Sequence, residues 1–457
     1  MKTFLGILIG ASALFFLSWF TVYKLNINTL AIQSEDTLPA MFMPFAIINE
    51  NTIYLDSYYK QLITKYPQPD DKTYVKGNVP FYLEKINNHY VSAFTIITPI
   101  IILPIYFIPI LLGVGPTWPN LIILSHVAEA LIMSLSGYLV YLISVKYLGA
   151  NKKQSLIVTI VYLFGSINFA LISQALWQHG TVQLLVLAGL FFYLKNQYNH
   201  LYLSVAGFFW GFAFLARPTA LLPLTIFGLL ILFMDRNLTK SLKQLVPLGL
   251  GLLPAILFFV WYNSTYYKSF SNQGYSQQLF TSWLGNFPVS LFGVWISPSK
   301  GILVYSPVFI FSLVGFFISL KNKVLKDRNL YIAFGIILLI HTVVISFWKH
   351  WYGGWSFGYR MSSDVIPFFA LLIIPFLQSS LYTKYKKFFW FLLAISVLVE
   401  FAGIIFFDGV WHAAYDRGFH DTSWLWSIKD SEFIFNVRRV LVKLHLLDRA
   451  CPKCLPL

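Results

Sequence analysis

Charged residues are scarce in this sequence. Asp, Glu, Lys and Arg make up 11% of its 457 residues, whereas soluble domains contain about 25%. Hydrophobic residues make up 57%, and the mean hydropathy is +0.67. This composition excludes a compact soluble fold, and the 19% aromatic content excludes a disordered chain. The apolar residues form continuous runs, unlike the ~10-residue alternating strands of a membrane β-barrel. We therefore expect an all-α polytopic membrane protein.

Cysteine is nearly absent. Cys451 and Cys454 both lie in the last seven residues, so no disulfide framework holds the body of the chain. A CxxC pair at a tail is a weak signal for redox or zinc chemistry. We expect a dispensable tail instead.

Apolar runs mark the candidate transmembrane helices. The first, residues 3–23, lacks a small-residue cleavage site and is long enough to span, so we expect a retained helix, not a signal peptide. Eleven further runs follow at 93–112, 121–145, 155–172, 181–194, 201–216, 218–234, 245–263, 303–320, 330–347, 364–379 and 388–407.

Lys and Arg are unevenly distributed between the loops. One alternating set of loops carries 14 of them and the other set carries five. Basic loops stay on the cytoplasmic side, so we expect the net charge of +15 to reflect topology and not a nucleic-acid partner. The expected cytoplasmic residues are Lys146, Lys152, Lys153, Lys195, Arg236, Lys240, Lys243, Lys321, Lys323, Lys326, Arg328, Lys384, Lys386 and Lys387.

The run 93–112 is expected not to cross the membrane. It contains Pro99, Pro104 and Pro109, each of which breaks helical hydrogen bonding. If it is re-entrant or lies on the surface, eleven crossings remain, with the N-terminus cytoplasmic and 24–120 forming a large extracytoplasmic loop. Residues 1–407 then form the membrane domain. The tail 408–457 lies outside and carries a basic amphipathic helix, expected on the membrane surface.

Two adjacent acids, Glu35 and Asp36, follow the first helix on the outer side. A carboxylate just outside a membrane helix can act as a general base toward a hydroxyl or amine acceptor. Both acids could instead cap the next helix, because acids favour a helix N-terminus and Pro39 suits an early helical position.

The predicted outer loop 348–363 is rich in Trp and Gly. Trp351, Tyr352 and Trp355 offer stacking faces for sugar rings, and Arg360 could hold a phosphate. An interfacial aromatic belt would explain the Trp residues. It would not explain the three glycines or the arginine, so we expect a donor-binding loop.

Three further polar residues lie at predicted outer positions. Lys300, among Ser and Gly, could bind phosphate or belong to a turn that leads into a helix. His179 could contact sugar or acceptor, or be a hydrogen-bonded interfacial histidine. Arg217 could meet a lipid phosphate or snorkel to the interface.

His126 and Glu129 lie within one predicted span. They are three residues apart and therefore share a helix face. Ionisable residues inside a membrane are costly and are functional candidates. A structural pair that holds the bundle together is the equal alternative.

Together these features resemble the GT-C class of membrane glycosyltransferases, in particular its protein O-mannosyltransferase and aminoarabinose-transferase branch. The resemblance rests on the acidic motif after the first helix, the proline-bearing run 93–112 and the basic turn 146–153. It covers the layout of residues 1–407 and implies about eleven helices. It also implies catalytic roles for Asp36 and Glu35, and donor phosphate binding by Arg360 and, more loosely, Arg217.

The resemblance implies a mannosyltransferase-like enzyme of the cell envelope. Such an enzyme moves one sugar, with inversion, from a polyprenyl-phosphate carrier to a protein, lipid or glycan acceptor outside the cytoplasm. The family's second outer loop often carries an Asp, where this sequence has His179 and no DxD or Asp-Asn-Glu motif. We therefore expect no metal and no other cofactor.

Two other classes of protein fit the composition. A transporter or lipid flippase would also bury ionisable groups, but it predicts paired broken helices and inverted repeats. A non-catalytic polysaccharide-assembly protein is the third possibility. The gathering of polar sequence on one face favours the enzyme.

Overall fold

The computed structural model describes residues 2–28, 30, 32–67, 79–196, 199–234, 238–269 and 281–451. It forms two compact units, which are described separately. Unit 1 consists of Met1–Phe16, Ser34–Gly149 and Ile172–Thr281. Unit 2 consists of Leu17–Gln33, Ala150–Leu171 and Ser282–Leu457, so the predicted tail belongs to the same unit as the last apolar helices. Helix α1 (Lys2–Lys24) contributes to both units.

Apolar helices dominate the described residues, as expected for a multi-pass helical membrane protein. Six are long enough and apolar enough to cross a membrane: Lys2–Lys24, Trp118–Lys146, Thr239–Tyr267, Arg328–Ser346, Arg360–Leu377 and Ser380–Phe406. Shorter apolar helices are Ile97–Leu111, Leu201–Ala216, Pro218–Phe233, Phe287–Ile296 and Pro307–Lys321. The number of eleven crossings and the orientation stay predictions. Of the basic residues predicted to be cytoplasmic, Arg236 lies outside the described ranges.

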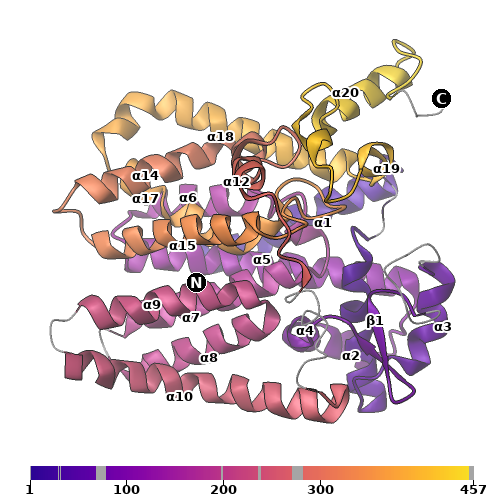
Figure 1. The fold of residues 1–457 in the computed structure, drawn as a ribbon, viewed down its shortest axis with the longest axis horizontal. Helices are drawn as coiled ribbons and strands as arrows, with labels where there is room; N and C mark the ends of the chain where they lie inside the picture. Colours follow the sequence, from indigo (N-terminus) through magenta and orange to yellow (C-terminus); the bar gives the residue numbers. More distant parts are fainter. Residues whose placement is uncertain are drawn as a thin grey trace. The chain divides into compact units, whose positions relative to one another are not determined.

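Unit 1 combines helices with one β-hairpin (Figure 1). Its further elements are η1 (Glu35–Thr37), α2 (Leu38–Glu50), α3 (Asp56–Lys65), β1 (Leu83–Ile86), β2 (His89–Ser92), α4 (Ile97–Leu111), α5 (Trp118–Lys146), η2 (Ile172–Gln174), α7 (Gln178–Lys195), α8 (Leu201–Ala216), η3 (Pro218–Ala220), α9 (Leu221–Met234), α10 (Leu238–Tyr262) and η4 (Asn263–Tyr267).

Helices α8 and α10 lie side by side and pack through small residues (Figure 1). A Cβ atom at Gly207 of α8 would overlap the carbonyl oxygen of Leu248 on α10. A Cβ atom at Gly251 of α10 would overlap the carbonyl oxygen of Ser204 on α8. The two backbones therefore touch only because glycine stands at these positions, as in other small-residue contacts between membrane helices.

Helix α4 occupies the proline-bearing run. Pro104 and Pro109 lie inside it, and its 15 residues are short for a membrane crossing. Ile102, Tyr106 and Ile110 follow one another at four-residue spacing and are buried, whereas the neighbouring apolar positions toward its end are exposed. The helix therefore buries one face in unit 1 and leaves an apolar face for lipid. The re-entrant or surface position stays a prediction.

A short β-hairpin accompanies the helices of unit 1. β1 and β2 pair antiparallel, with Leu83 opposite Ser92. The turn residues Asn87 and Asn88 have φ angles of 47° and 68°, the left-handed backbone of a tight two-residue hairpin turn that asparagine tolerates. Leu83 and Val91 are fully buried and anchor the hairpin to unit 1.

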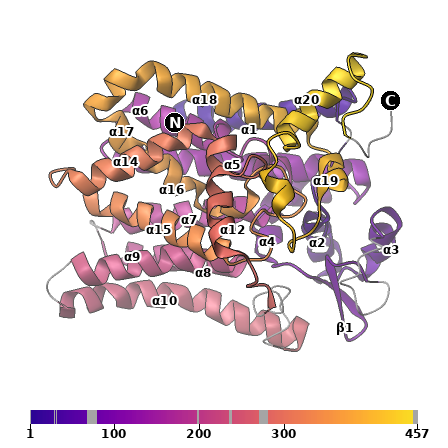
Figure 2. The same ribbon diagram turned by 45° about the horizontal axis from the view of Figure 1, so that its top comes forward.

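The regular elements of unit 2 among its described residues are all helices (Figure 2). Besides part of α1, its elements are α6 (Lys152–Phe164), α12 (Phe287–Ile296), α13 (Ile302–Tyr305), η5 (Pro307–Phe309), α14 (Ile310–Lys321), α15 (Arg328–Ser346), η6 (Arg360–Val365), α16 (Ile366–Leu371), α17 (Ile374–Leu377), α18 (Ser380–Phe406), α19 (Val410–Tyr415), η7 (Ser423–Trp426) and α20 (Glu432–Lys443).

A buried polar chain joins the loop 348–363 to the helices of unit 2. Ser306 Oγ donates to Glu400 Oε1 of α18 over 3.2 Å and lies 2.7 Å from the Tyr359 hydroxyl. That hydroxyl also accepts the Ile167 N–H over 3.1 Å. All of these side chains are buried, so the end of the loop is held by satisfied hydrogen bonds instead of apolar contact alone.

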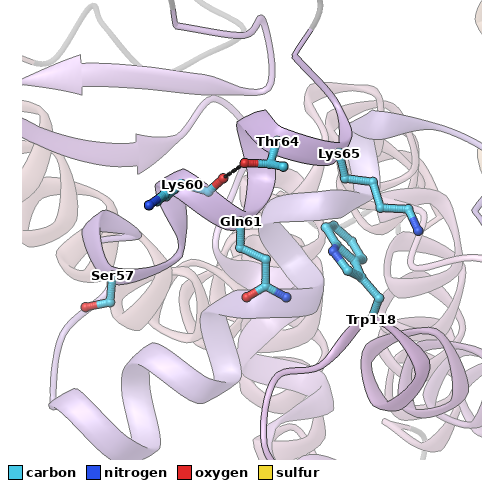
Figure 3. Close-up of a pocket in the computed structure, with 6 residues that line it drawn as sticks. All are labelled: Ser57, Lys60, Gln61, Thr64, Lys65 and Trp118. Atoms are coloured by element: carbon cyan, nitrogen blue, oxygen red, sulfur yellow. Dashed lines mark hydrogen bonds between the residues drawn. The ribbon is translucent and has the colours of Figure 1, made fainter.

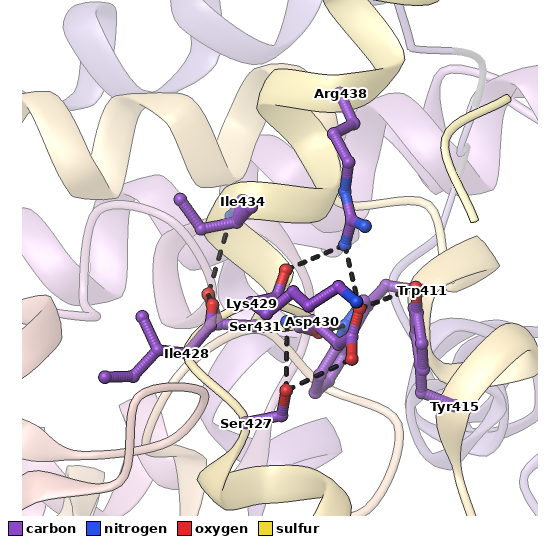
Figure 4. A network of polar contacts seen from close by, with 9 residues as sticks. All are labelled: Trp411, Tyr415, Ser427, Ile428, Lys429, Asp430, Ser431, Ile434 and Arg438. Carbon is purple, nitrogen blue, oxygen red and sulfur yellow. Dashed lines mark hydrogen bonds and ion pairs between the residues drawn. The ribbon is translucent and has the colours of Figure 1, made fainter. Parts of the chain in front are cut away.

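The predicted amphipathic helix, α20, is tied to unit 2 by its arginines. Arg438 donates to Asp430 Oδ1 over 3.1 Å, and Figure 4 shows this pair beside Ser427 and Trp411. Arg439 forms a two-pronged pair with Asp408, at 2.5 and 3.1 Å. Both arginines therefore form ion pairs with aspartates of unit 2. The membrane-surface position of this helix stays a prediction.

Candidate functional site

The acidic turn of unit 1 is a 3₁₀ turn that leads straight into α2. Ser34 takes the capping role, because its Oγ accepts the Asp36 N–H over 3.3 Å. The N-cap of α2 is Thr37, which makes no side-chain capping bond. Neither predicted carboxylate, Glu35 nor Asp36, is therefore an N-cap. Both are half-buried, which leaves the general-base interpretation open.

Arg217 links two elements of unit 1. It ends α8 and directly precedes η3, with an extended backbone (φ −154°, ψ 133°). The side chain is only 7% exposed. A snorkelling arginine would extend out of the protein, whereas this side chain is buried.

Glu129 of α5 lies against the first turn of α7. A Cβ atom at Gly180 would overlap Glu129 Oε1, so glycine is required for this contact. Glu129 is fully buried, and neither of its oxygens has a hydrogen-bond partner among the described residues. His126 shares its helix face but bonds the Ile122 carbonyl oxygen through Nδ1 over 2.8 Å. No hydrogen bond therefore joins His126 to Glu129. His179, in the same first turn of α7, is also buried.

The glycines of the loop 348–363 shape its backbone in unit 2. Gly353, Gly354 and Gly358 have φ angles of 85°, 61° and 56°, which other residues rarely adopt. A Cβ atom at Gly353 would lie 3.1 Å from Arg360 Cβ. The close approach brings one end of the loop against the first residue of η6 and so positions Arg360.

Lys300 lies beneath this loop. It is 1% exposed, and its Nζ donates to the Ser356 carbonyl oxygen and to His412 Nε2, the latter over 3.1 Å. Burial lowers the pKa of Lys300 to about 8, partly offset by the negative charges of Glu432 and Asp416. The ammonium group is therefore still charged at neutral pH, and it braces the loop against α19.

Two buried histidines of this part of unit 2 are neutral. Burial, together with the Lys300 charge, holds the pKa of His412 well below its usual range. Burial and the charges of Lys349 and Arg360 lower the pKa of His350 to about 4. Arg360 lowers the pKa of Lys300 as well. Arg360 and Lys300 thus form one cationic site in which the imidazoles carry no charge.

A carboxyl group lies at the buried side of the site. Glu432, in the first turn of α20, is 1% exposed and accepts a 3.2 Å hydrogen bond from the Tyr305 hydroxyl. Burial raises its pKa to about 7, although the Lys300 charge acts in the opposite direction. The carboxyl group therefore titrates near neutral pH and partly compensates Lys300.

The three predicted stacking residues differ in exposure. Trp355 is 53% exposed, and its Nε1 donates to Asp416 Oδ2 over 2.7 Å. Trp351 is buried against α12, where a Cβ atom at Gly293 would overlap its ring. Tyr352 is buried as well, with its ring 5.8 Å from that of Trp424. Only Trp355 presents a face to a ligand.

The structure thus brings Arg360, Lys300 and Trp355 together in unit 2. It adds residues that the sequence analysis missed, chiefly His412, Asp416 and Glu432. The stretch 411–416 follows the last apolar run and contains Trp, His, Tyr and Asp. This gathering of polar and aromatic residues was the sequence signal that could have indicated them. The described residues include no group of three or more His, Cys, Asp or Glu side chains placed to hold a metal ion. Metal-independent chemistry stays a prediction.

Comparisons with known proteins find similarity only among solved structures. No protein-family model and no curated protein matches the chain. The oligosaccharyltransferase of Archaeoglobus fulgidus in complex with zinc and sulfate is 14% identical, with a TM-score of 0.45 over 83% of this chain and 55% of that chain. The same enzyme tethered by a disulfide to an acceptor peptide with the NVT sequon is 13% identical, with a TM-score of 0.44 over 87% and 57%.

The apo form of that oligosaccharyltransferase is 13% identical, with a TM-score of 0.40 over 90% of this chain and 60% of that chain. This chain therefore spans less than two thirds of the length of the structures it matches. A TM-score below 0.5 does not establish a shared fold. The residues of this chain, and not the similarity to these structures, therefore support the proposed function.

Proposed function

We propose that this chain is a membrane glycosyltransferase of the GT-C class. It moves a sugar from a polyprenyl-phosphate carrier to an acceptor outside the cytoplasm, with inversion at the anomeric carbon. The observation that carries the proposal is the arrangement on the loop 348–363. An exposed indole, Trp355, and a half-buried guanidinium, Arg360, lie five residues apart above the charged Lys300. A sugar and the phosphate attached to it need such a pair of groups.

Each part of the donor has a matching group in unit 2. The phosphate pairs with Arg360, whose planar fork suits phosphate oxygens, and Lys300 adds positive charge from below. The sugar stacks on Trp355. The polyprenyl chain lies along α12, where Phe292 and Ile296 are 61% and 50% exposed at four-residue spacing. Trp351 connects that helix to the loop through its contact with Gly293.

The proposal assigns acceptor activation to Asp36. The Asp36 carboxylate accepts the proton of the acceptor hydroxyl or amine. The acceptor attacks the anomeric carbon from the side opposite the phosphate. The bond between that carbon and the phosphate oxygen breaks, and its electron pair leaves with polyprenyl phosphate. Arg360 stabilises the negative charge that develops on the leaving group.

The test is the fate of a radiolabelled polyprenyl-phosphate sugar in proteoliposomes supplied with a membrane extract as acceptor source. We expect polyprenyl phosphate to be released and the product to have inverted anomeric configuration by NMR. A flippase would instead move the intact donor across the bilayer without cleaving it. Translocation without release of polyprenyl phosphate would contradict the proposal.

A further inference from the structure

Helix α3 carries a polar face that the proposed reaction does not use. Ser57, Lys60, Gln61, Thr64 and Lys65 follow the i, i+3, i+4, i+7, i+8 spacing of one helix face. Tyr58 and Leu62, four residues apart on another face, are buried and fix the helix to unit 1.

This polar face lines a hollow of about 690 Å³ whose further wall is Trp118, at the start of α5 (Figure 3). Lys65 Nζ lies 5.3 Å from the centre of the Trp118 ring. Gln61 Nε2 donates to the Pro116 carbonyl oxygen over 2.8 Å. Figure 3 shows Lys60 and Lys65 extending to opposite sides, with Gln61 between them. The hollow is therefore an open depression whose wall is fixed by the Gln61 hydrogen bond, with a cation at each end.

The predicted topology puts the hollow at the outer surface of the membrane. Trp118 is the first residue of the candidate span Trp118–Lys146, and Trp is enriched where membrane helices meet the interface. Tyr66 packs edge-on against it, with ring centres 5.4 Å apart. The span ends in Lys146, and basic ends are cytoplasmic. The hollow consequently faces the outer leaflet.

The charge around the hollow favours an anionic occupant that also carries hydroxyls. Lys60 and Lys65 are exposed cations. The nearby Asp56 carboxylate is engaged by His89 at 2.6 Å and by the Tyr90 N–H at 2.7 Å. At one end Ser57 donates to Glu50 Oε2 over 3.0 Å. The oxygens of these two side chains can accept further hydrogen bonds from hydroxyl groups.

We infer that this hollow binds the headgroup of an anionic phospholipid of the outer leaflet, its phosphate at Lys65 beside Trp118 and its glycerol hydroxyls toward Ser57 and Glu50 at the other end, where Lys60 adds a second positive charge. Polybasic sites near a membrane surface attract such lipids by about 1 kcal/mol per cation. The inference does not depend on the proposed function, because none of these residues takes part in the transfer reaction.

The test is native mass spectrometry of the full-length protein released from nanodiscs of phosphatidylcholine with phosphatidylglycerol. We expect wild type to retain phosphatidylglycerol in preference to phosphatidylcholine. The double variant Lys60→Gln/Lys65→Gln should retain the two lipids alike. The matched control Lys85→Gln/Lys268→Gln removes the same charge from exposed sites of unit 1 outside the hollow, and it should behave as wild type. Equal retention in wild type and the Lys60/Lys65 variant would overturn the inference.

A second arm separates a lipid headgroup from a soluble phosphate. Protein loaded with phosphatidylglycerol is incubated with inorganic phosphate or with glycerol 3-phosphate, and the retained lipid is measured by native mass spectrometry. We expect neither to displace phosphatidylglycerol, because the soluble compounds lack the acyl chains that hold the headgroup at the interface. Displacement by inorganic phosphate in wild type, but not in the Lys60/Lys65 variant, would assign the hollow to soluble phosphate and overturn the lipid assignment.

Discussion

The indole nitrogen of Trp355 donates a 2.7 Å hydrogen bond to Asp416 Oδ2. An exposed tryptophan is ordinarily free to change rotamer, whereas this one is tied to a residue of the tail. The ring also lies near His412, with centres 5.9 Å apart and planes at 25°. The contact joins the loop 348–363 to the tail, so we expect the tail beyond residue 407 to contribute to donor binding.

Asp416→Ala should raise the donor KM by up to about tenfold, since a tenfold change corresponds to ~1.4 kcal/mol. The variant frees the Trp355 ring, which must then be ordered when the sugar binds. Steady-state kinetics at fixed acceptor measure the change. Asp421→Ala is the matched control, because Asp421 pairs with Arg417 and lies on the same tail. Identical donor KM values in the two variants would show that the hydrogen bond between Trp355 and Asp416 does not contribute to donor binding.

Arg360→Ala should weaken donor binding more than acceptor binding. It removes a charge-assisted contact of about 1.5–3 kcal/mol, equivalent to a rise of roughly 10- to 150-fold in donor KM. Arg360→Lys should rescue only in part, because the fork geometry is lost. Arg417→Ala, an exposed arginine of the same unit, serves as control. An unchanged donor KM in both Arg360 variants would rule out phosphate binding there.

The lowered pKa of Lys300 predicts that, above pH 8, the protein becomes more stable while it binds the donor more weakly. The group loses its proton at about pH 8 in the folded protein and near 10.5 when unfolded. The unfolded state thus binds more protons in this window, and stability should rise with pH. Donor KM should rise over the same window, because a phosphate-facing charge is lost. Lys300→Met should abolish both trends; persistence of the KM rise in this variant would assign it to another group.

Topology can be tested by cysteine labelling in a Cys451→Ser/Cys454→Ser background. Lys85→Cys on the β-hairpin should react with an impermeant maleimide in intact cells, and Lys323→Cys only after lysis; both positions are exposed. The reverse labelling pattern would refute the orientation.

Local sequence patterns predicted much of the framework. The apolar runs correspond to helices, and the proline-bearing run forms the short helix α4. The three glycines of the loop 348–363 were singled out from the sequence, and the structure gives each of them a left-handed backbone. These features depend on a residue and its near neighbours, so they can be inferred without knowing the fold.

Long-range relationships could not be predicted in this way. Lys300 and His412 are 112 residues apart in sequence yet in hydrogen-bond contact. Nothing local distinguishes the exposed Trp355 from the buried Trp351, because burial depends on the Gly293 contact in another helix. His126 and Glu129 share a face, as their spacing requires, but His126 bonds its own backbone instead. Side-chain partners follow from packing, which periodicity does not specify.

Asp36 is the proposed general base of the transfer reaction. Asp36→Asn keeps the shape of the side chain and the Ser34 capping bond to the Asp36 backbone, but it cannot accept a proton. We expect kcat to fall by about 10²–10⁴-fold with little change in donor affinity, and Glu35→Gln to cost less. Full activity of both variants, with normal folding and insertion, would show that the carboxylates are structural and would contradict the account.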